Sequence, residues 1–112
     1  MQTYDMKLHA APFATIRAKT KTVEMRLYDE KRQALQVGDL LRFTNVDTGE
    51  TLLADIIALH VYPTFDELYE RFDKTALGYA ENERANPNDM LAYYSQENIA
   101  KYGVIGIEIR LK

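Results

Sequence analysis

Residues 21–26 have the sequence KTVEMR, which sets an amine, a carboxylate and a guanidinium within six positions. Apolar residues at every second position from Val23 alternate with polar ones, the period of a β-strand with one apolar face. The other face of that strand points Glu24 and Arg26 in the same direction. The pattern predicts a strand that carries an acid and a base on its polar face. The direction of Lys21, at the junction before the strand, stays open.

A solvated strand face explains the same pattern without any function. Glutamate and arginine two positions apart are ordinary on such a face, where an exposed ion pair contributes only about 0–1 kcal/mol. Residues 21–26 are therefore compatible with both a plain edge or barrel strand and a functional cluster. The rest of the chain decides between the two.

The chain has 112 residues, a length typical of one domain, and we expect residues 1–112 to form that domain. Apolar residues make up 46% and charged residues 28%, both ordinary for a globular protein. The absence of cysteine excludes disulfides and thiolate sites. His9 and His60 are far apart in the sequence, so we expect neither a metal ion nor another cofactor.

The net charge of −3 argues against a sequence-independent grip on long duplex DNA, which needs a broad basic surface. A small basic pocket for one nucleotide or a short single strand remains compatible with that charge. The N-terminus has no long apolar run, and no stretch approaches the roughly 18 apolar residues of a membrane span. We therefore expect a cytoplasmic protein that does not contact membranes.

Alternating apolar residues and turn signals predict five strands. They cover residues 4–9, 21–27, 40–43, 51–62 and 104–111. The fourth strand is long and apolar, which favours a curved sheet that rolls into a small barrel. The last strand, rich in isoleucine, is expected to close it.

Helices are expected between several of these strands. Pro12 suits the first turn of a short helix, and Thr64 with Glu67 three residues later forms the capping-box pattern. Asn86 and Ser95 are N-cap candidates for two more helices. Most helices thus fall in one insertion between the fourth and fifth strands. The sequence predicts an α+β fold, a small barrel with helical cover on one side.

Two further clusters have more than one interpretation. Residues 29–32, DEKR, predict a solvated turn, the alternative being that Lys31 or Arg32 reaches the site and contacts a phosphate. The aromatic residues between 65 and 72 have helical spacing, which favours core packing over a base-stacking platform.

The segment IRAKTKTVEMR at residues 16–26 resembles the signature of the ASCH family, whose core is Gly-x-Lys-x-x-Glu-x-Arg. Three later segments agree with that family in the same order. They are VGD at 37–39, YPTFDEL at 62–68 and YGVIGI at 102–107. The resemblance spans nearly the whole chain.

This resemblance implies a PUA-like β-barrel with a cleft between barrel and helices, used on RNA or nucleotides. ASCH proteins are mostly considered RNA-binding or RNA-processing modules. One bacterial branch of similar length hydrolyses 4-acetylcytidine with a lysine, a threonine and a glutamate, and at least one other member is described as a ribonuclease. The chain is similar to small bacterial single-domain members, so RNA or a small nucleoside or nucleotide is the implied partner.

Carried over by position, Lys21 matches the signature lysine, which is catalytic in the amidohydrolase branch, and Arg26 matches the signature arginine. Glu24 stands where that branch has its threonine. The catalytic glutamate of the branch lies in the helical region. The candidates for it, in order, are Glu81, Glu67 and Glu83. The implied catalytic set is Lys21, Glu24 and Glu81. The usual signature glycine is Lys19 here, which leaves open the backbone shape of that turn.

The chemistry separates three hypotheses. A lysine that acts as base or nucleophile must be partly neutral near pH 7, which takes a fall of its pKa by about 3. Arg17, Lys19 and Arg26 favour that fall and Glu24 opposes it. Hydrolysis, with a helix-borne glutamate moving the proton, is therefore the alternative. A purely structural or protein-interaction barrel is the third.

Binding of RNA or a nucleotide is the first choice. In that hypothesis Lys21 and Arg26 contact phosphate or a base carbonyl, and Glu24 accepts an exocyclic amine. Arg17 and Lys19 are further candidates for ligand contact. Tyr93 or Tyr94 stacks on the base.

Overall fold

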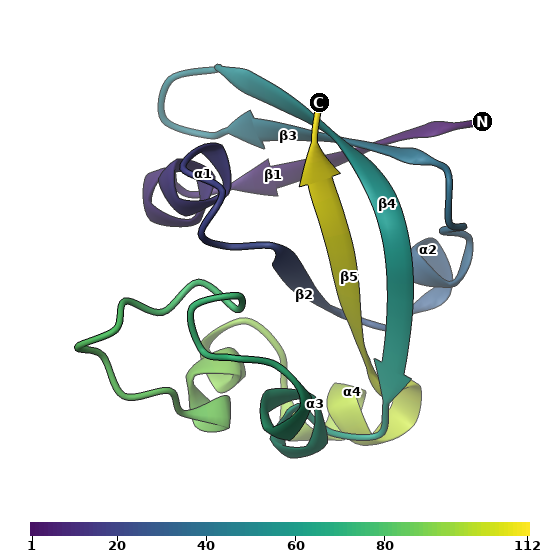
Figure 1. The fold of residues 1–112 in the computed structure, drawn as a ribbon. Coiled ribbons are helices and arrows are strands. Elements are labelled where there is room, and N and C mark those ends of the chain that lie inside the picture. The colour runs from purple at the N-terminus through teal and green to yellow at the C-terminus, as the bar shows by residue number, and fades with distance from the viewer.

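Five strands form one mixed sheet in the computed structural model, which describes residues 1–112 (Figure 1). The strands are β1 (Thr3–Leu8), β2 (Val23–Leu27), β3 (Leu40–Asn45), β4 (Thr51–Tyr62) and β5 (Val104–Leu111). Their order in the sheet is β1-β3-β4-β5-β2, with β1 parallel to β3 and all other pairs antiparallel. The five predicted strands are confirmed.

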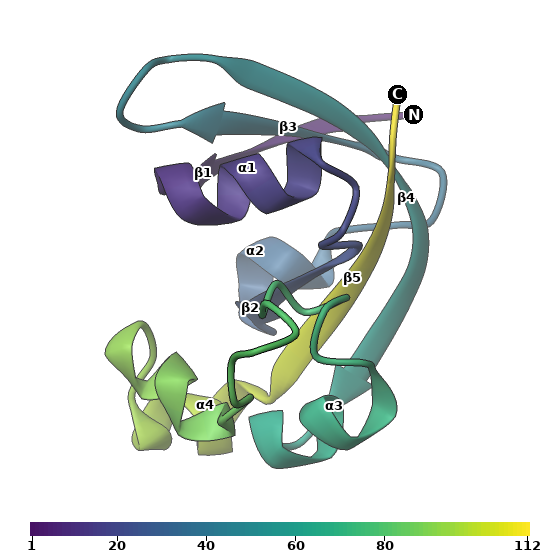
Figure 2. The same ribbon diagram turned by 60° about the vertical axis from the view of Figure 1, so that its left-hand side comes forward.

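The sheet curls without closing. Its edge strands, β1 and β2, do not pair with each other, and β5 lies inside the sheet between β4 and β2. The expectation that β5 closes a barrel is wrong in this respect, and the fold is a half-barrel. A register shift between Ile56 and Ala58 interrupts the β4–β5 ladder, and such a bulge bends a strand. Figures 1 and 2 show β4 curving along the whole sheet.

Short helices connect the strands. They are α1 (Ala10–Arg17), α2 (Glu30–Gln33), α3 (Phe65–Arg71), the 3₁₀-helix η1 (Pro87–Ala92) and α4 (Gln96–Tyr102). Three predicted caps are present: Thr64, Asn86 and Ser95 each accept a hydrogen bond from a backbone N–H two or three residues later. The expected turn at residues 29–32 is instead the start of α2, which Asp29 caps. No helix has the length and apolarity needed to cross a membrane.

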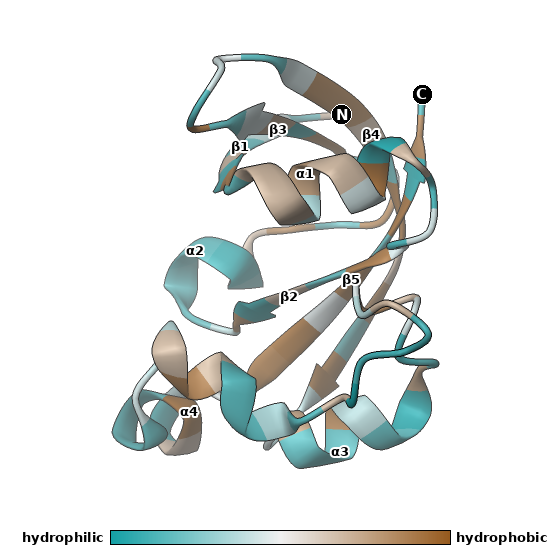
Figure 3. Ribbon diagram, turned by 90° about the vertical axis from the view of Figure 1, so that its left-hand side faces the viewer, coloured by the Kyte–Doolittle hydropathy of each residue, from teal (hydrophilic) through white to brown (hydrophobic).

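Two apolar clusters stabilise this arrangement. The first joins the concave face of the sheet to α1, and the second joins β2 and the start of β5 to the helical layer, by which we mean residues 63–103. The first contains Met6, Leu8, Phe13, Ile16, Leu35, Leu41, Phe43, Ala54, Ile56, Ile105, Ile107 and Ile109. The second contains Val23, Met25, Phe65, Leu68, Leu77, Met90 and Val104. The helical layer gathers at one end of the sheet, and hydrophilic residues follow one another along α3 and the loop beside it (Figure 3).

Candidate functional site

The polar face of β2 is buried. Glu24 is only 3% exposed, because the strand is covered by the sheet on one side and by the helical layer on the other. The backbone N–H groups of Thr22 and Val23 both donate to the carbonyl of Ala76 at 3.0 Å, which fixes the start of β2 against that layer. A solvated outer face is therefore excluded for Glu24.

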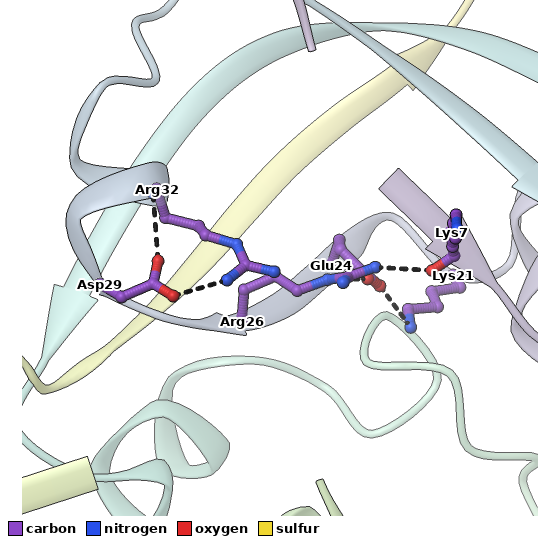
Figure 4. A network of polar contacts seen from close by, with 6 residues as sticks. All are labelled: Lys7, Lys21, Glu24, Arg26, Asp29 and Arg32. Atoms are coloured by element: carbon purple, nitrogen blue, oxygen red, sulfur yellow. Dashed lines mark hydrogen bonds and ion pairs between the residues drawn. The ribbon is translucent and has the colours of Figure 1, made fainter. Parts of the chain in front are cut away.

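Lys21, Glu24 and Arg26 converge (Figure 4). The Lys21 Nζ lies 2.8 Å from Glu24 Oε1, and the Arg26 Nε lies 2.7 Å from Glu24 Oε2. Their side chains are 9%, 4% and 15% exposed, respectively. Arg26 Nη2 also donates to the backbone carbonyl of Lys7 at 3.1 Å, across the gap between the two edge strands. One carboxylate thus holds two cations, each through a different oxygen.

The two cations keep Glu24 ionised. Burial alone would raise the pKa of the Glu24 carboxyl, but the charges and hydrogen bonds of Lys21 and Arg26 outweigh it and hold that pKa below its ordinary value. Burial alone would lower the pKa of Arg26, and the carboxylate of Glu24 reverses that shift and raises it. Glu24 is therefore an acceptor of hydrogen bonds only.

Lys21, Glu24 and Arg26, which we call the triad, lie in the wall of a pocket of about 490 Å³ between the half-barrel and the helical layer. This volume is in the range of small-molecule sites. Besides the triad, the polar and aromatic lining residues are Lys7, His9, Thr15, Tyr69, Tyr79, Glu83, Asp89, Tyr93 and Tyr94. The pocket thus combines charged groups of both signs with aromatic rings.

Two tyrosines in the pocket wall are joined in a chain of hydrogen bonds. The hydroxyl oxygens of Tyr69 and Tyr79 are 2.9 Å apart, and the Tyr79 hydroxyl donates to Asp89 Oδ2 at 2.7 Å. A second acceptor, the carbonyl of Asn86, lies 3.2 Å from Tyr79. Burial, reinforced by the bond to Tyr79, raises the pKa of Tyr69 well above its ordinary value. Tyr69 therefore keeps its proton at neutral pH.

Gly78 shapes the path of Lys21. Its φ of +109° lies in the region that favours glycine, and a Cβ built at Gly78 would come within 3.0 Å of Lys21 Cδ. The lysine stem therefore runs closely past the backbone of residue 78 on its way to Glu24.

Four cations that the sequence analysis placed near the site lie outside the pocket lining. Arg17 pairs with Glu50, its Nη2 2.6 Å from Oε2. Lys19 is exposed and has a φ of +66°, so it adopts the left-handed conformation that the family glycine would adopt easily. Arg32, the alternative phosphate contact, pairs with Asp29 at 2.8 Å. Lys31 is exposed and outside the pocket as well.

Of the three helical glutamates proposed from the sequence, the one placed last is the one that lines the pocket. Glu83 lines the pocket, where its Oε1 accepts a hydrogen bond from the Ala80 N–H at 2.6 Å. Glu81 and Glu67 are not among the lining residues. Tyr93 and Tyr94, the predicted stacking candidates, both line the pocket; Tyr93 is 65% exposed, and Tyr94 stacks on Phe65.

Sequence reasoning missed six polar or aromatic lining residues: Lys7, His9, Thr15, Tyr69, Tyr79 and Asp89. They come from the end of β1, the N-cap and the body of α1, α3, the following loop and η1. Tyr69 was assigned to core packing from its helical spacing, and it does pack against the second cluster while also reaching the pocket. No local pattern marks the others, since only the tertiary fold brings them together.

The comparisons with known proteins agree with this architecture. The hypothetical protein PH0355 shares 28% identity with a TM-score of 0.83, each chain covered fully. The protein PF0455 from Pyrococcus furiosus shares 29% identity with a TM-score of 0.76 over 97% of this chain and 96% of that one. ZmASCH from Zymomonas mobilis has the same fold at 13% identity, with a TM-score of 0.68 over 96% of this chain and 67% of that one. No curated protein matches the sequence.

The family assignment comes from the sequence itself. Residues 6–112 match the family model of the ASCH domain, which is nearly the entire chain. ASCH domains adopt the curled PUA-like sheet described above and are generally thought to bind RNA. The buried triad is formed by the Lys, Glu and Arg of the signature segment. This chain belongs to the ASCH domain family.

Proposed function

We propose that the pocket binds one nucleotide of a single-stranded RNA, or a free nucleoside or nucleotide. The observation that carries the proposal is the buried triad of Lys21, Glu24 and Arg26 in the wall of a 490 Å³ pocket with tyrosines around it. Bases are recognised in single strands by polar groups along their edges and by aromatic side chains on their faces. The pocket supplies both kinds of group.

The burial of the triad supports a functional role. Taking charges out of water costs several kcal/mol per ion, and apolar residues of similar size often stabilise a core equally well. A buried, paired ionic cluster in a cavity is therefore a reasonable candidate for a binding site. Lys21 keeps ammonium hydrogens beyond the one that faces Glu24.

The triad differs in one role from the sequence-based hypothesis. Glu24 was expected to accept an exocyclic amine of the ligand. Both of its oxygens already accept a bond from a cation, so we assign it the orientation of Lys21 and Arg26. These two residues then donate to a carbonyl or phosphate oxygen of the ligand, and Tyr93, which is largely exposed, stacks on the base.

The ion pairs favour binding over catalysis. A base or nucleophile needs a free nitrogen, and the Nζ of Lys21 is engaged in an ion pair with the carboxylate of Glu24 at 2.8 Å. Glu24 itself has a lowered pKa, which makes it a weak proton acceptor near neutral pH. A charged donor pair held this way is well suited to fixing an oxygen of a ligand.

The test is a titration of the protein with nucleoside monophosphates and with a short single-stranded RNA. Calorimetry and the NMR chemical shifts of the pocket residues monitor binding. We expect Lys21→Ala to weaken binding tenfold or more, as for the loss of a charge-assisted hydrogen bond. Lys101→Ala, an exposed lysine of α4 outside the pocket, is the matched control and should bind as the parent does. Absence of binding to the parent at millimolar ligand would contradict the proposal.

Hydrolysis of a modified nucleoside such as 4-acetylcytidine, or of RNA, is the second candidate. It is favoured by Glu83 and His9, two proton-transfer groups that share the pocket with Lys21. Incubation with acetylated cytidine and with single-stranded RNA tests it, with Glu83→Gln as the variant and Glu81→Gln as the control. Turnover that Glu83→Gln abolishes and Glu81→Gln retains would make the protein an enzyme.

A further inference from the structure

We propose that Tyr69 makes the pocket selective for bases that carry an exocyclic amine over their keto counterparts. This inference rests on the proposed function, because it concerns which ligand the same pocket accepts. It assigns a specificity-determining role to a residue outside the signature segment. The selectivity follows from the direction of the hydrogen bonds between Tyr69, Tyr79 and Asp89.

That direction is fixed at the Asp89 end. A carboxylate can only accept, so the single hydroxyl hydrogen of Tyr79 goes to Asp89 Oδ2, 2.7 Å away, in preference to the carbonyl of Asn86 at 3.2 Å. With its hydrogen engaged, the Tyr79 oxygen can serve its neighbour only as an acceptor. The 2.9 Å contact must then be a donation from Tyr69 to Tyr79.

Tyr69 is thereby left without a hydrogen for a ligand. Its oxygen retains a free lone pair, and the residue lines the pocket. The raised pKa of Tyr69 agrees with a hydroxyl that keeps its proton and donates it in a hydrogen bond to Tyr79. Toward a ligand, Tyr69 therefore presents an acceptor, whereas the neighbouring carboxylates of Asp89 and Glu83 already accept hydrogen bonds from Tyr79 and from the Ala80 N–H.

The triad presents the opposite character. Lys21 and Arg26 are donors, and the stem of Lys21 passes Gly78, the residue next to Tyr79, so the donor and acceptor groups border one cavity. A base that bridges them needs a ring nitrogen or carbonyl acceptor on one side and an N–H donor on the other. Cytosine and adenine offer an exocyclic amine for the acceptor wall. Uracil and hypoxanthine place a carbonyl oxygen there, which meets an acceptor.

The experiment compares two pairs of ligands that differ by this exchange of amine for carbonyl: cytidine with uridine, and adenosine with inosine. We expect the parent protein to bind the amine member of each pair more tightly, by about tenfold, as for one gained hydrogen bond and one avoided repulsion. Dissociation constants from calorimetry give the ratio for each pair.

Two variants test the assignment to Tyr69. Tyr69→Phe removes the acceptor oxygen, so both ratios should fall to about one. Tyr79→Phe removes the partner that takes the Tyr69 hydrogen, so Tyr69 becomes free to donate, and binding of uridine and inosine should tighten. Tyr102→Phe, a half-buried tyrosine outside the pocket, should leave both ratios unchanged. Thermal unfolding of each variant reports on the fold separately from the ratios.

The outcomes separate this inference from the function on which it rests. If the parent binds neither these nucleosides nor the nucleoside monophosphates and RNA of the earlier titration, the proposed function fails and the inference with it. Binding of the monophosphates or RNA without binding of any of the four nucleosides overturns the inference alone. Equal binding of the amine and keto members by the parent overturns the inference alone. A ratio that persists in Tyr69→Phe also overturns it, since the selectivity would then come from other groups.

Discussion

Glu24 is the residue that makes the charged cluster tolerable inside the protein. Glu24→Gln keeps the size of the side chain but leaves Lys21 and Arg26 buried beside each other without a counter-charge. We expect the free energy of unfolding at pH 7 to fall by about 3–5 kcal/mol, as when one member of a buried ion pair is removed. Urea denaturation measures this, and Glu81→Gln on the surface should change it little.

The difference in unfolding free energy between the parent and Glu24→Gln has a predictable pH dependence. The pKa of Glu24 in the folded state lies below its ordinary value of 4.5, so the unfolded chain binds the proton more readily. The stabilisation is complete above that ordinary value and is lost as the pH falls through the lowered, folded-state pKa. The difference in stability between parent and Glu24→Gln should therefore narrow on acidification. A difference that stays constant from pH 7 to strong acid would contradict the assignment.

Lys19 is a second residue whose conformation has a measurable cost. It has a φ of +66°, where a side chain with a Cβ is disfavoured by about 1–2 kcal/mol and glycine is not. Glycine also gains conformational freedom in the unfolded chain, which lowers the free energy of unfolding by about 0.5–1 kcal/mol and offsets part of this gain. We expect Lys19→Gly to raise the free energy of unfolding by up to about 1 kcal/mol. Lys19→Ala, which removes the charge and keeps the Cβ, is the control, and it should show no such gain.

At the scale of elements, local signals predicted what is local. The strands follow from alternating residues, and the caps at Thr64, Asn86 and Ser95 follow from side-chain oxygens that reach the next turn. Helix α2 was missed because DEKR is polar in every direction. What holds its four residues is the cap by Asp29 and the Asp29–Arg32 pair, and neither leaves a periodic pattern.

The pocket was only half predictable for the same reason. The three charges of residues 21–26 share one strand and its preceding turn, so sequence spacing brings them together. The opposite wall comes from residues 69–94, where turns and a 3₁₀-helix follow each other without periodicity. Glu83 could not be told from Glu81 because the choice depends on the path of that loop.

Gly78, in the segment of residues 69–94, lies against Lys21, so a substitution there should change ligand binding through the position of that lysine. Gly78→Ala would set a Cβ 3.0 Å from Lys21 Cδ, so the lysine stem has to shift away. We expect ligand affinity to fall severalfold, as for a weakened hydrogen bond. Gly38→Ala is a close control, because Gly38 also has a positive φ of +96° but no atom within 4 Å of its built Cβ. If Gly38→Ala weakens ligand binding as much as Gly78→Ala does, backbone strain and not the contact with Lys21 accounts for the loss of affinity.

At the scale of the molecule, the sequence predicted the fold class and the helical insertion but not the open edge. Whether a five-stranded sheet closes depends on twist and register between strands that are distant in the chain. Here β5 pairs with both β4 and β2, which places it inside the sheet and leaves β1 at the far edge.

The two apolar clusters raise the question of whether the molecule unfolds in one step. Adjacent residues of β5 belong to different clusters, Val104 to the second and Ile105 to the first. Loss of either cluster therefore disturbs the strand that the other needs. We expect one cooperative transition, with far-ultraviolet circular dichroism and tyrosine fluorescence changing at the same denaturant concentration. An earlier change in the fluorescence of the helical layer, which holds Tyr69, Tyr79 and Tyr94, would contradict this.

The hydrogen bond from Arg26 to the carbonyl of Lys7 is the one that joins β1 to β2. Separation of these two strands breaks this hydrogen bond, whose charged donor makes it worth about 1.5–3 kcal/mol, and none of the β-ladders of the sheet. The two edges of the half-barrel are thus hydrogen-bonded at one point, next to the cavity. We therefore expect a ligand too broad for the cavity to enter by breaking the hydrogen bond between Arg26 and the Lys7 carbonyl.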